Sequence, residues 1–248
     1  MWLVLASSTD ASALWVYQGL QALGITPLQF VSAESLGSVR HWEHRLGSDG
    51  ATIKMILEDG RTLCGSRIRG VVNRLVSAPL NELYRAAPPD RDYAAQEMLA
   101  LYMSWLHALP KPMLNRPTPQ GLSGRWRHCS EWAWLASRAG LPVEVYRQRG
   151  TDPPEMGYRT LAPPDRPVAS AIVCGGRTFG TDLPSEIASG CQSLAELAEI
   201  DLLGVEFYSS ASHPHTFASA SPMPDLRPGG WPLIQSIGQI LRNGAGKT

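Results

Sequence analysis

The stretch "FASASPMPD", residues 217–225, has the pattern of a strand that ends in a tight, proline-rich turn. The segment "LLGVEFYSS" upstream has the pattern of a second strand, and the short loop "ASHPH" joins the two. Many enzymes hold a metal ion through acidic side chains on such a hairpin, because hard cations prefer carboxylate oxygens. In "FASASPMPD" the side chains that could point toward such a site are serine and alanine. The hairpin therefore indicates either an unusual site or a site that has lost its chemistry.

A second group of polar candidates follows the predicted strands nearer the N-terminus. The loop "SSTD" lies between an apolar run and a helical pattern, where backbone N–H groups can hold an anion. Simple capping of the helix by Thr9 or Asp10 is the other interpretation. Polar residues also stand at the ends of two presumed parallel strands, where open α/β sheets bind ligands, although each fits an ion pair or a cap equally well. The candidates for binding are Ser8, Thr9, Arg74, Asn115 and Arg116.

Three further motifs do not support a site. "GAGKT" at residues 244–248 is not a phosphate-binding loop, because Leu241 stands where the first glycine belongs. His213 and His215 lack a third ligand at metal-binding spacing, so we expect a loop turn there. The four cysteines form no CxxC pair, which favours buried reduced thiols over zinc. We predict no metal site and no catalytic residue.

Composition excludes several classes of protein. The chain balances 22 Lys and Arg against 22 Asp and Glu, and only three of these cations are lysine. A neutral chain lacks the basic surface typical of proteins that bind nucleic acid or anionic membranes. We do not expect the first residues to act as a signal peptide, because they carry no basic region and turn polar within six residues, and no apolar run approaches the ~20 residues that span a bilayer. We expect a cytoplasmic protein without nucleic-acid or membrane partners.

The order of patterns predicts an α/β fold with a small parallel, Rossmann-like N-terminal layer. "WLVLA" and "PLQFV" read as strands around a helix, residues 34–46 as a second helix, and residues 51–64 as a hairpin that turns at Asp59-Gly60. A helical region follows, with Asp90 before one helix and Ser123 opening another. The patterns that follow predict a hairpin that turns at Gly175-Gly176, a helix capped by Ser193, and the late hairpin that contains "LLGVEFYSS" and "FASASPMPD".

The resulting order of elements resembles that of the ATP-grasp carboxylate–amine ligases, in the branch of ribosomal-protein glutamate ligases and microviridin-type peptide-crosslinking ligases. The stretches that carry the resemblance cover most of the chain in the family's order. They are "GVVNRLV", "QEMLALYMSWLHALPKPMLNRP", "SEWAWLASRAGLPVE", "VASAIVCGGRTFG" and "LAEIDLLGVEFYSSASHPHTFASASPMPD".

The resemblance implies a division into four parts. Residues 1–76 would form a Rossmann-like layer, 77–146 a helical linker region and 147–167 a proline-rich loop. Residues 168–248 would form a truncated ATP-grasp-like domain with an antiparallel sheet and helices.

Three departures from the family pattern bear on activity. The family's phosphate-binding lysine falls near Cys129, where only Arg125 or Arg127 could supply charge. The segment 148–167 is too short for the subdomain that covers the adenine and offers a second lysine. On the last hairpin Glu206 matches the family's first acid, whereas Ser219 and Ser221 stand in place of its glutamate and asparagine.

These departures predict a protein that has lost ATP chemistry and binds a partner protein or a peptide in peptide modification, with Glu206 retained for binding. ATP and Mg²⁺ are cofactors only under the alternative, an active ligase that works alone or is completed by another subunit. A small-molecule-binding module that uses the strand-end crevice is a third possibility.

Loss of the covering subdomain would also expose side chains around the late hairpin. The candidates are Phe207, Phe217, Met223 and Trp231. An exposed apolar face of this kind usually marks an interaction site, so we expect a homo- or hetero-oligomer.

Overall fold

The computed structural model describes residues 1–248 except 81–82, 85, 110–111, 145–167, 211–212 and 245–248. The chain forms two compact units. Unit 1 comprises Met1–Arg125 and Ile234–Thr248, and unit 2 comprises Trp126–Leu233. The proline-rich loop expected at 147–167 lies outside the described residues, and the four-part division of the sequence stays a prediction.

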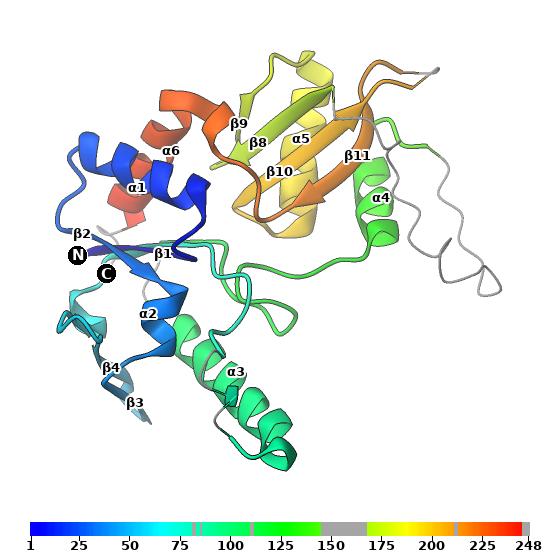
Figure 1. The fold of residues 1–248 in the computed structure, drawn as a ribbon. Helices are drawn as coiled ribbons and strands as arrows, with labels where there is room; N and C mark the ends of the chain where they lie inside the picture. The colour runs from blue at the N-terminus through cyan, green and yellow to red at the C-terminus, as the bar shows by residue number, and fades with distance from the viewer. Residues whose placement is uncertain (81–82, 85, 110–111, 145–167, 211–212, 245–248) are drawn as a thin grey trace. The chain divides into compact units, whose positions relative to one another are not determined.

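Unit 1 is built on a parallel sheet with the strand order β2-β1-β6-β7. Its strands are β1 (Trp2–Ala6), β2 (Leu28–Ser32), β6 (Gly70–Asn73) and β7 (Met113–Leu114). Helix α1 (Ala11–Ala22) follows β1 and lies beside α6 (Gly230–Gly244) (Figure 1). The two helices pack closely because a Cβ atom on Gly19 would lie only 2.7 Å from Ile234 Cδ1. The parallel layer predicted from the sequence is confirmed.

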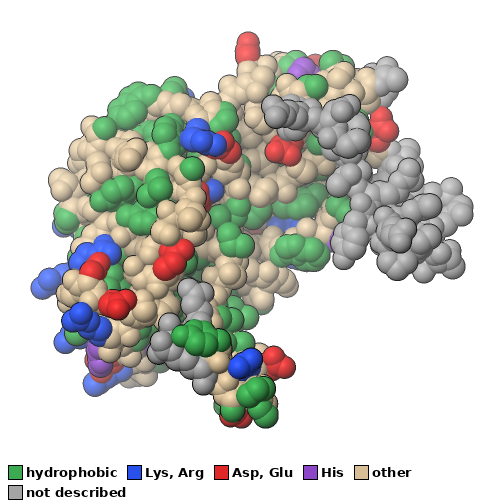
Figure 2. All heavy atoms as spheres, in the orientation of Figure 1, with side chains coloured by type: hydrophobic (Ala, Val, Ile, Leu, Met, Phe, Trp, Pro, Cys, Tyr) green, Lys and Arg blue, Asp and Glu red, His purple; other side chains and the backbone are tan. Residues whose placement is uncertain are grey.

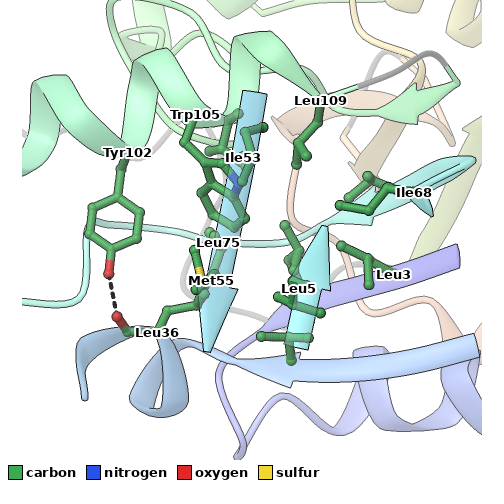
Figure 3. Close-up of a cluster of buried hydrophobic side chains, with 14 of the residues drawn as sticks. Leu3, Leu5, Leu36, Ile53, Met55, Ile68, Leu75, Tyr102, Trp105 and Leu109 are labelled. Carbon is green, nitrogen blue, oxygen red and sulfur yellow. Dashed lines mark hydrogen bonds between the residues drawn. The ribbon is translucent and has the colours of Figure 1, made fainter. Parts of the chain in front are cut away.

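A second layer of unit 1 covers the other face of this sheet. It consists of α2 (Ala33–Gly37), α3 (Arg91–Ala108) and the antiparallel strands β3 (His41–Gly47), β4 (Gly50–Ile56) and β5 (Thr62–Cys64). Figure 3 shows Tyr102 and Trp105 of α3 packed among buried side chains of β1, β4 and the neighbouring loops. The Tyr102 hydroxyl donates to the Leu36 carbonyl oxygen at 2.8 Å, which satisfies this buried polar group.

The helix predicted for residues 34–46 is wrong over most of its length. Only α2 is helical, and residues 41–47 form β3, which pairs with β4 in register from His41–Ile56 to Gly47–Gly50. Strand alternation turns Trp42 inward, where its ring meets Tyr102 and Trp105 edge to face at 5.0 and 5.4 Å. This aromatic packing stabilises the strand over the local helical pattern.

Unit 2 is an antiparallel sheet with helices on one face (Figure 1). Its strand order is β11-β10-β8-β9, and its core lies between the sheet and the helices. The strands are β8 (Ala169–Cys174), β9 (Arg177–Gly180), β10 (Leu202–Tyr208) and β11 (Thr216–Ser221), and the helices are α4 (Cys129–Arg138) and α5 (Ser185–Ala198). The predicted antiparallel sheet with helices is confirmed.

Two predicted helix starts are corrected. Helix α4 begins at Cys129 and not at Ser123, whose hydroxyl donates to the Leu75 carbonyl oxygen at 2.5 Å. Helix α5 begins at Ser185, directly after Pro184, and not at Ser193. Short 3-10 turns are formed by Gly65–Arg67, Pro88–Asp90 and Arg227–Gly229. No helix within the described ranges has the length and apolar character needed to cross a membrane.

Candidate functional site

Strand alternation in β10 places Glu206 on the face of the unit 2 sheet that the helices leave uncovered. Leu203, Val205 and Phe207 contribute to the core beneath α4 and α5. Gly204 and Glu206 alternate with them and therefore project to the opposite face. Glu206 is exposed there. The open face is the candidate site that the late hairpin provides.

A register shift between Glu206 and Phe207 aligns the hairpin so that Glu206 lies directly opposite Ser219. The Ser219 hydroxyl donates to Glu206 Oε2 at 2.8 Å. On its other side Glu206 lies opposite Ser170 of β8. Ser221 is occupied locally, because its hydroxyl oxygen accepts the backbone N–H of Met223 at 3.0 Å. One carboxylate therefore stands among neutral hydroxyl groups.

The proline-rich turn after β11 borders this site on one side. A Cβ atom on Gly204 would lie 2.4 Å from Pro224 Cβ, so the turn folds directly over the strand at this glycine. The resulting cavity has a volume of about 260 Å³ and also contains Asp225 in its lining. Asp225 is paired with Arg227 at 2.7 Å, and its hydrogen bonds and charge raise the pKa of the Arg227 guanidinium. The second carboxylate of the cavity is thus already partnered by a cation.

The described residues offer few groups that could hold a metal ion or a polyphosphate. No three His, Cys, Asp or Glu side chains among them form a group suited to a metal. Lys54 of β4 is the sole lysine in the described ranges and lies in unit 1. Near Cys129, Arg127 is engaged within unit 2: it donates to Glu131 at 3.1 Å and to the Ala198 carbonyl oxygen at 2.9 Å. Arg127 therefore joins α4 to the end of α5.

The carboxyl edge of the parallel sheet in unit 1 holds the other predicted binding residues. The loop after β1 surrounds a carboxylate of the chain itself, because Glu34 accepts the Ser7 hydroxyl and the Ser8 backbone N–H, both at 3.0 Å. Burial opposes ionisation of Glu34, but backbone hydrogen bonds from Glu34 and Ser8, together with the Ser7 and Ser32 hydroxyls, lower its pKa overall. Glu34 thus lies where the sequence predicted an anion. Glu34 follows β2 as Ser7 follows β1, and the two strands are parallel neighbours. Because the carboxyl ends of such strands meet at one sheet edge, the sequence could have indicated that Glu34 lies near Ser7.

Arg74 is buried at the end of β6, with 4% of its side chain exposed. Its Nε donates to Asp10 Oδ2 at 2.8 Å, while Asp10 Oδ1 caps α1 by accepting the Ala13 N–H. The guanidinium Nη1 has no hydrogen-bond partner among the described residues. Arg74 therefore joins β6 to the start of α1.

Asn115 and Arg116 follow β7 at the same edge. Asn115 has a left-handed backbone conformation (φ 57°), and its carbonyl oxygen accepts from Asn73 Nδ2 at 3.0 Å. Arg116 Nη2 lies 3.4 Å from the His107 carbonyl oxygen. Ser8, Thr9, Arg74, Asn115 and Arg116 thus gather at one sheet edge, whereas Glu206 belongs to the other unit. Their roles in binding stay predictions.

The prediction of an exposed apolar face around the late hairpin is wrong for Phe207 and Phe217. Phe207 and Phe217 are 0% and 1% exposed, because both side chains pack into the core beneath α4 and α5. The register shift after Glu206 brings the two phenylalanines opposite each other on this covered face. Met223 is half-buried, and only Trp231 of the four residues is well exposed.

Comparisons with known proteins identify the fold. No family model matches the sequence, and no curated protein matches it. The structure is similar to macrocyclase MdnC bound with precursor peptide MdnA from Microcystis aeruginosa MRC, with a TM-score of 0.75 and 13% identity over 98% of this chain and 100% of that chain. The structure is also similar to a Chryseobacterium gregarium RiPP-associated ATP-grasp ligase in complex with ADP and a leader and core peptide. The TM-score is 0.70, with 10% identity over 98% of this chain and 96% of that chain. For D-alanine-D-alanine ligase from Aeromonas hydrophila the TM-score is 0.50, with 14% identity over 98% of this chain and 99% of that chain. The chain has an ATP-grasp-like fold.

Proposed function

We propose that this chain is a catalytically silent ATP-grasp-like protein that binds a peptide or a partner protein in peptide modification. The observation that carries the proposal is the open face of the unit 2 sheet, where Glu206 is hydrogen-bonded to the neutral Ser219. The proposal includes no ATP and no Mg²⁺ as cofactors of this chain.

The charge around Glu206 supports the loss of ATP chemistry. Mg²⁺ bound with a triphosphate is usually held by one or two carboxylates, and phosphoryl transfer depends on cations that offset the developing negative charge. One Glu206 oxygen already accepts a hydrogen bond from Ser219, and Asp225 is paired with Arg227. The described part of unit 2 contains no lysine that could replace a phosphate-binding cation.

Two structural neighbours support the peptide as partner. MdnC is described as bound with a precursor peptide, and the Chryseobacterium gregarium ligase as bound with a leader and core peptide. A fold can keep a binding surface after its chemistry is lost, because function resides in sites and not in folds. The proposed context is therefore peptide tailoring, with a peptide or the partner enzyme as the bound molecule.

Titration calorimetry with ATP and MgCl₂ tests the proposal. We expect no saturable heat for the wild-type chain, and the same result for Glu206→Ala. The alternative, a ligase with a rearranged metal site, requires saturable ATP binding that Glu206→Ala weakens. Repeating the titration with proteins co-purified from the native host distinguishes a ligase completed by another subunit, because nucleotide binding would then appear only in the complex.

A further inference from the structure

Helix α3 extends beyond the core that holds its C-terminal half. Its buried residues are Tyr102, Trp105 and Leu106, all in its last two turns. None of residues 91–101 is buried. A helix is normally stabilised by packing of its apolar face, and Leu99 on the projecting half is 44% exposed. The projecting half of α3 therefore presents an apolar side chain, Leu99, that the described residues do not bury.

A groove of about 410 Å³ runs beside this half of the helix. Ala95, Leu99 and Met103 of α3 form one wall, and segments 76–80 and 119–122 form the others. Val76 at its rim is 74% exposed. Figure 2 shows hydrophobic side chains at the surface over this part of the molecule. The volume suits one or two large apolar side chains of a ligand.

The charges around the groove restrict its occupant. Among the described residues its lining includes Ser77, Gln96 and Gln120 but no charged side chain, so these residues would not compensate a charged group bound within it for its lost hydration. Asp92 is exposed and belongs to the stripe of α3 that contains Gln96, Leu99 and Met103, one turn beyond the groove. The neighbouring Arg91 donates to the carbonyl oxygens of Tyr84 and Ala86. The complementary ligand is therefore apolar in the groove and cationic at the end near Asp92.

We infer that this groove, lined by Val76, Ala95, Leu99 and Met103, binds a peptide segment through an apolar anchor with a Lys or Arg nearby. The helical rise places Asp92 about 10 Å along the axis from Leu99, which sets the distance between anchor and cation. The inference rests on the proposed function and names the surface and the chemistry of the peptide.

A phage-displayed library of random 15-residue peptides provides the probe. Clones selected on the wild-type chain are expected to bind Leu99→Gln at least tenfold more weakly and to carry a large apolar residue with a Lys or Arg. Tyr93→Gln is the matched control, because Tyr93 is a 68% exposed apolar side chain of α3 that does not line the groove. It should bind the same clones as the wild type. Asp92→Lys should bind these clones severalfold more weakly than the wild type. A new selection on Asp92→Lys should yield clones with Asp or Glu in place of the Lys or Arg.

Equal binding of the clones to wild type and Leu99→Gln would show that the groove is not the peptide-binding surface, although the chain would still bind peptides. Clones without cation preference, or unaffected by Asp92→Lys, would overturn the assigned polarity. If the wild type selects no clone, the inference fails as a whole. The silence toward ATP is judged separately by calorimetry, so the two failures are distinguishable.

Discussion

The Arg74–Asp10 pair is the residue-scale contact on which the carboxyl edge of unit 1 depends. The guanidinium is buried and the carboxylate both neutralises it and caps α1. Asp10→Asn would leave a buried, uncompensated charge, a change that costs ~3–5 kcal/mol in comparable sites. We predict a loss of unfolding free energy of about 3 kcal/mol in urea denaturation. Asp49→Asn, in the exposed turn between β3 and β4, should change it by less than about 0.5 kcal/mol. Equal effects of the two variants would contradict a structural role for the pair.

Sequence patterns located the residues of this edge but not their contacts. The apolar runs place Arg74 and Asn115 directly after β6 and β7, as the structure has them. The partner of Arg74 lies 64 residues earlier, and Glu34 reaches the Ser7–Ser8 loop from 26 residues away. Such pairings depend on the tertiary arrangement of the strands, which no local pattern contains. The same limit explains Phe207 and Phe217, because alternation does not say which face the helices cover.

At the scale of elements, the packing of α5 on the unit 2 sheet contains a pH-sensitive group. Burial raises the pKa of the Cys191 thiol to about 12, from an ordinary value of 9.0. The unfolded thiol therefore ionises first as the pH rises above 9, while the folded thiol keeps its proton. The resulting stabilisation is fully present below pH 9 and is lost between pH 9 and 12, at about 1.4 kcal/mol per pH unit.

Cys191→Ala removes this group and gives the second prediction. Between pH 8 and 10.5 the wild-type unfolding free energy should fall by about 2 kcal/mol more than that of Cys191→Ala, measured by urea denaturation. Alanine is chosen because serine would bury an additional polar hydroxyl. Parallel curves for the two proteins would show that the thiol does not titrate as its burial requires.

The elements that the sequence misassigned share a physical cause. The start of α5 was missed because Gly190 interrupts the helical pattern, yet a Cβ there would lie 2.6 Å from Leu141 Cδ2. The glycine is required by the close approach of the segment after α4, which overrides its low helix propensity. Residues 41–47 likewise form a strand because they pair with β4, although their local pattern is helical. Strands with strong apolar runs and the turns at Asp59-Gly60 and Gly175-Gly176 were predictable, because their signals are local.

At the scale of the whole molecule, the core of unit 2 is built from its own residues. The members of this core lie between Trp132 and Phe217, within Trp126–Leu233. A domain with its own core can fold alone. We therefore predict that a fragment of residues 126–233 shows a single cooperative transition in urea, followed by circular dichroism. Leu194→Ala in the fragment should lower its midpoint, because Leu194 is fully buried, whereas the exposed Leu197→Ala should change it little. A gradual transition without a midpoint would refute the independence of this unit.

The proposed loss of ATP chemistry concerns the whole chain and is tested most directly by phosphate release from ATP in the presence of MgCl₂. For the purified chain we predict no release above the protein-free background. The Ser219→Glu, Ser221→Asn double variant should remain equally silent, because the described part of unit 2 still lacks a lysine for the phosphates. Phosphate release above background that Glu206→Ala abolishes would contradict the account and identify the chain as a working ligase.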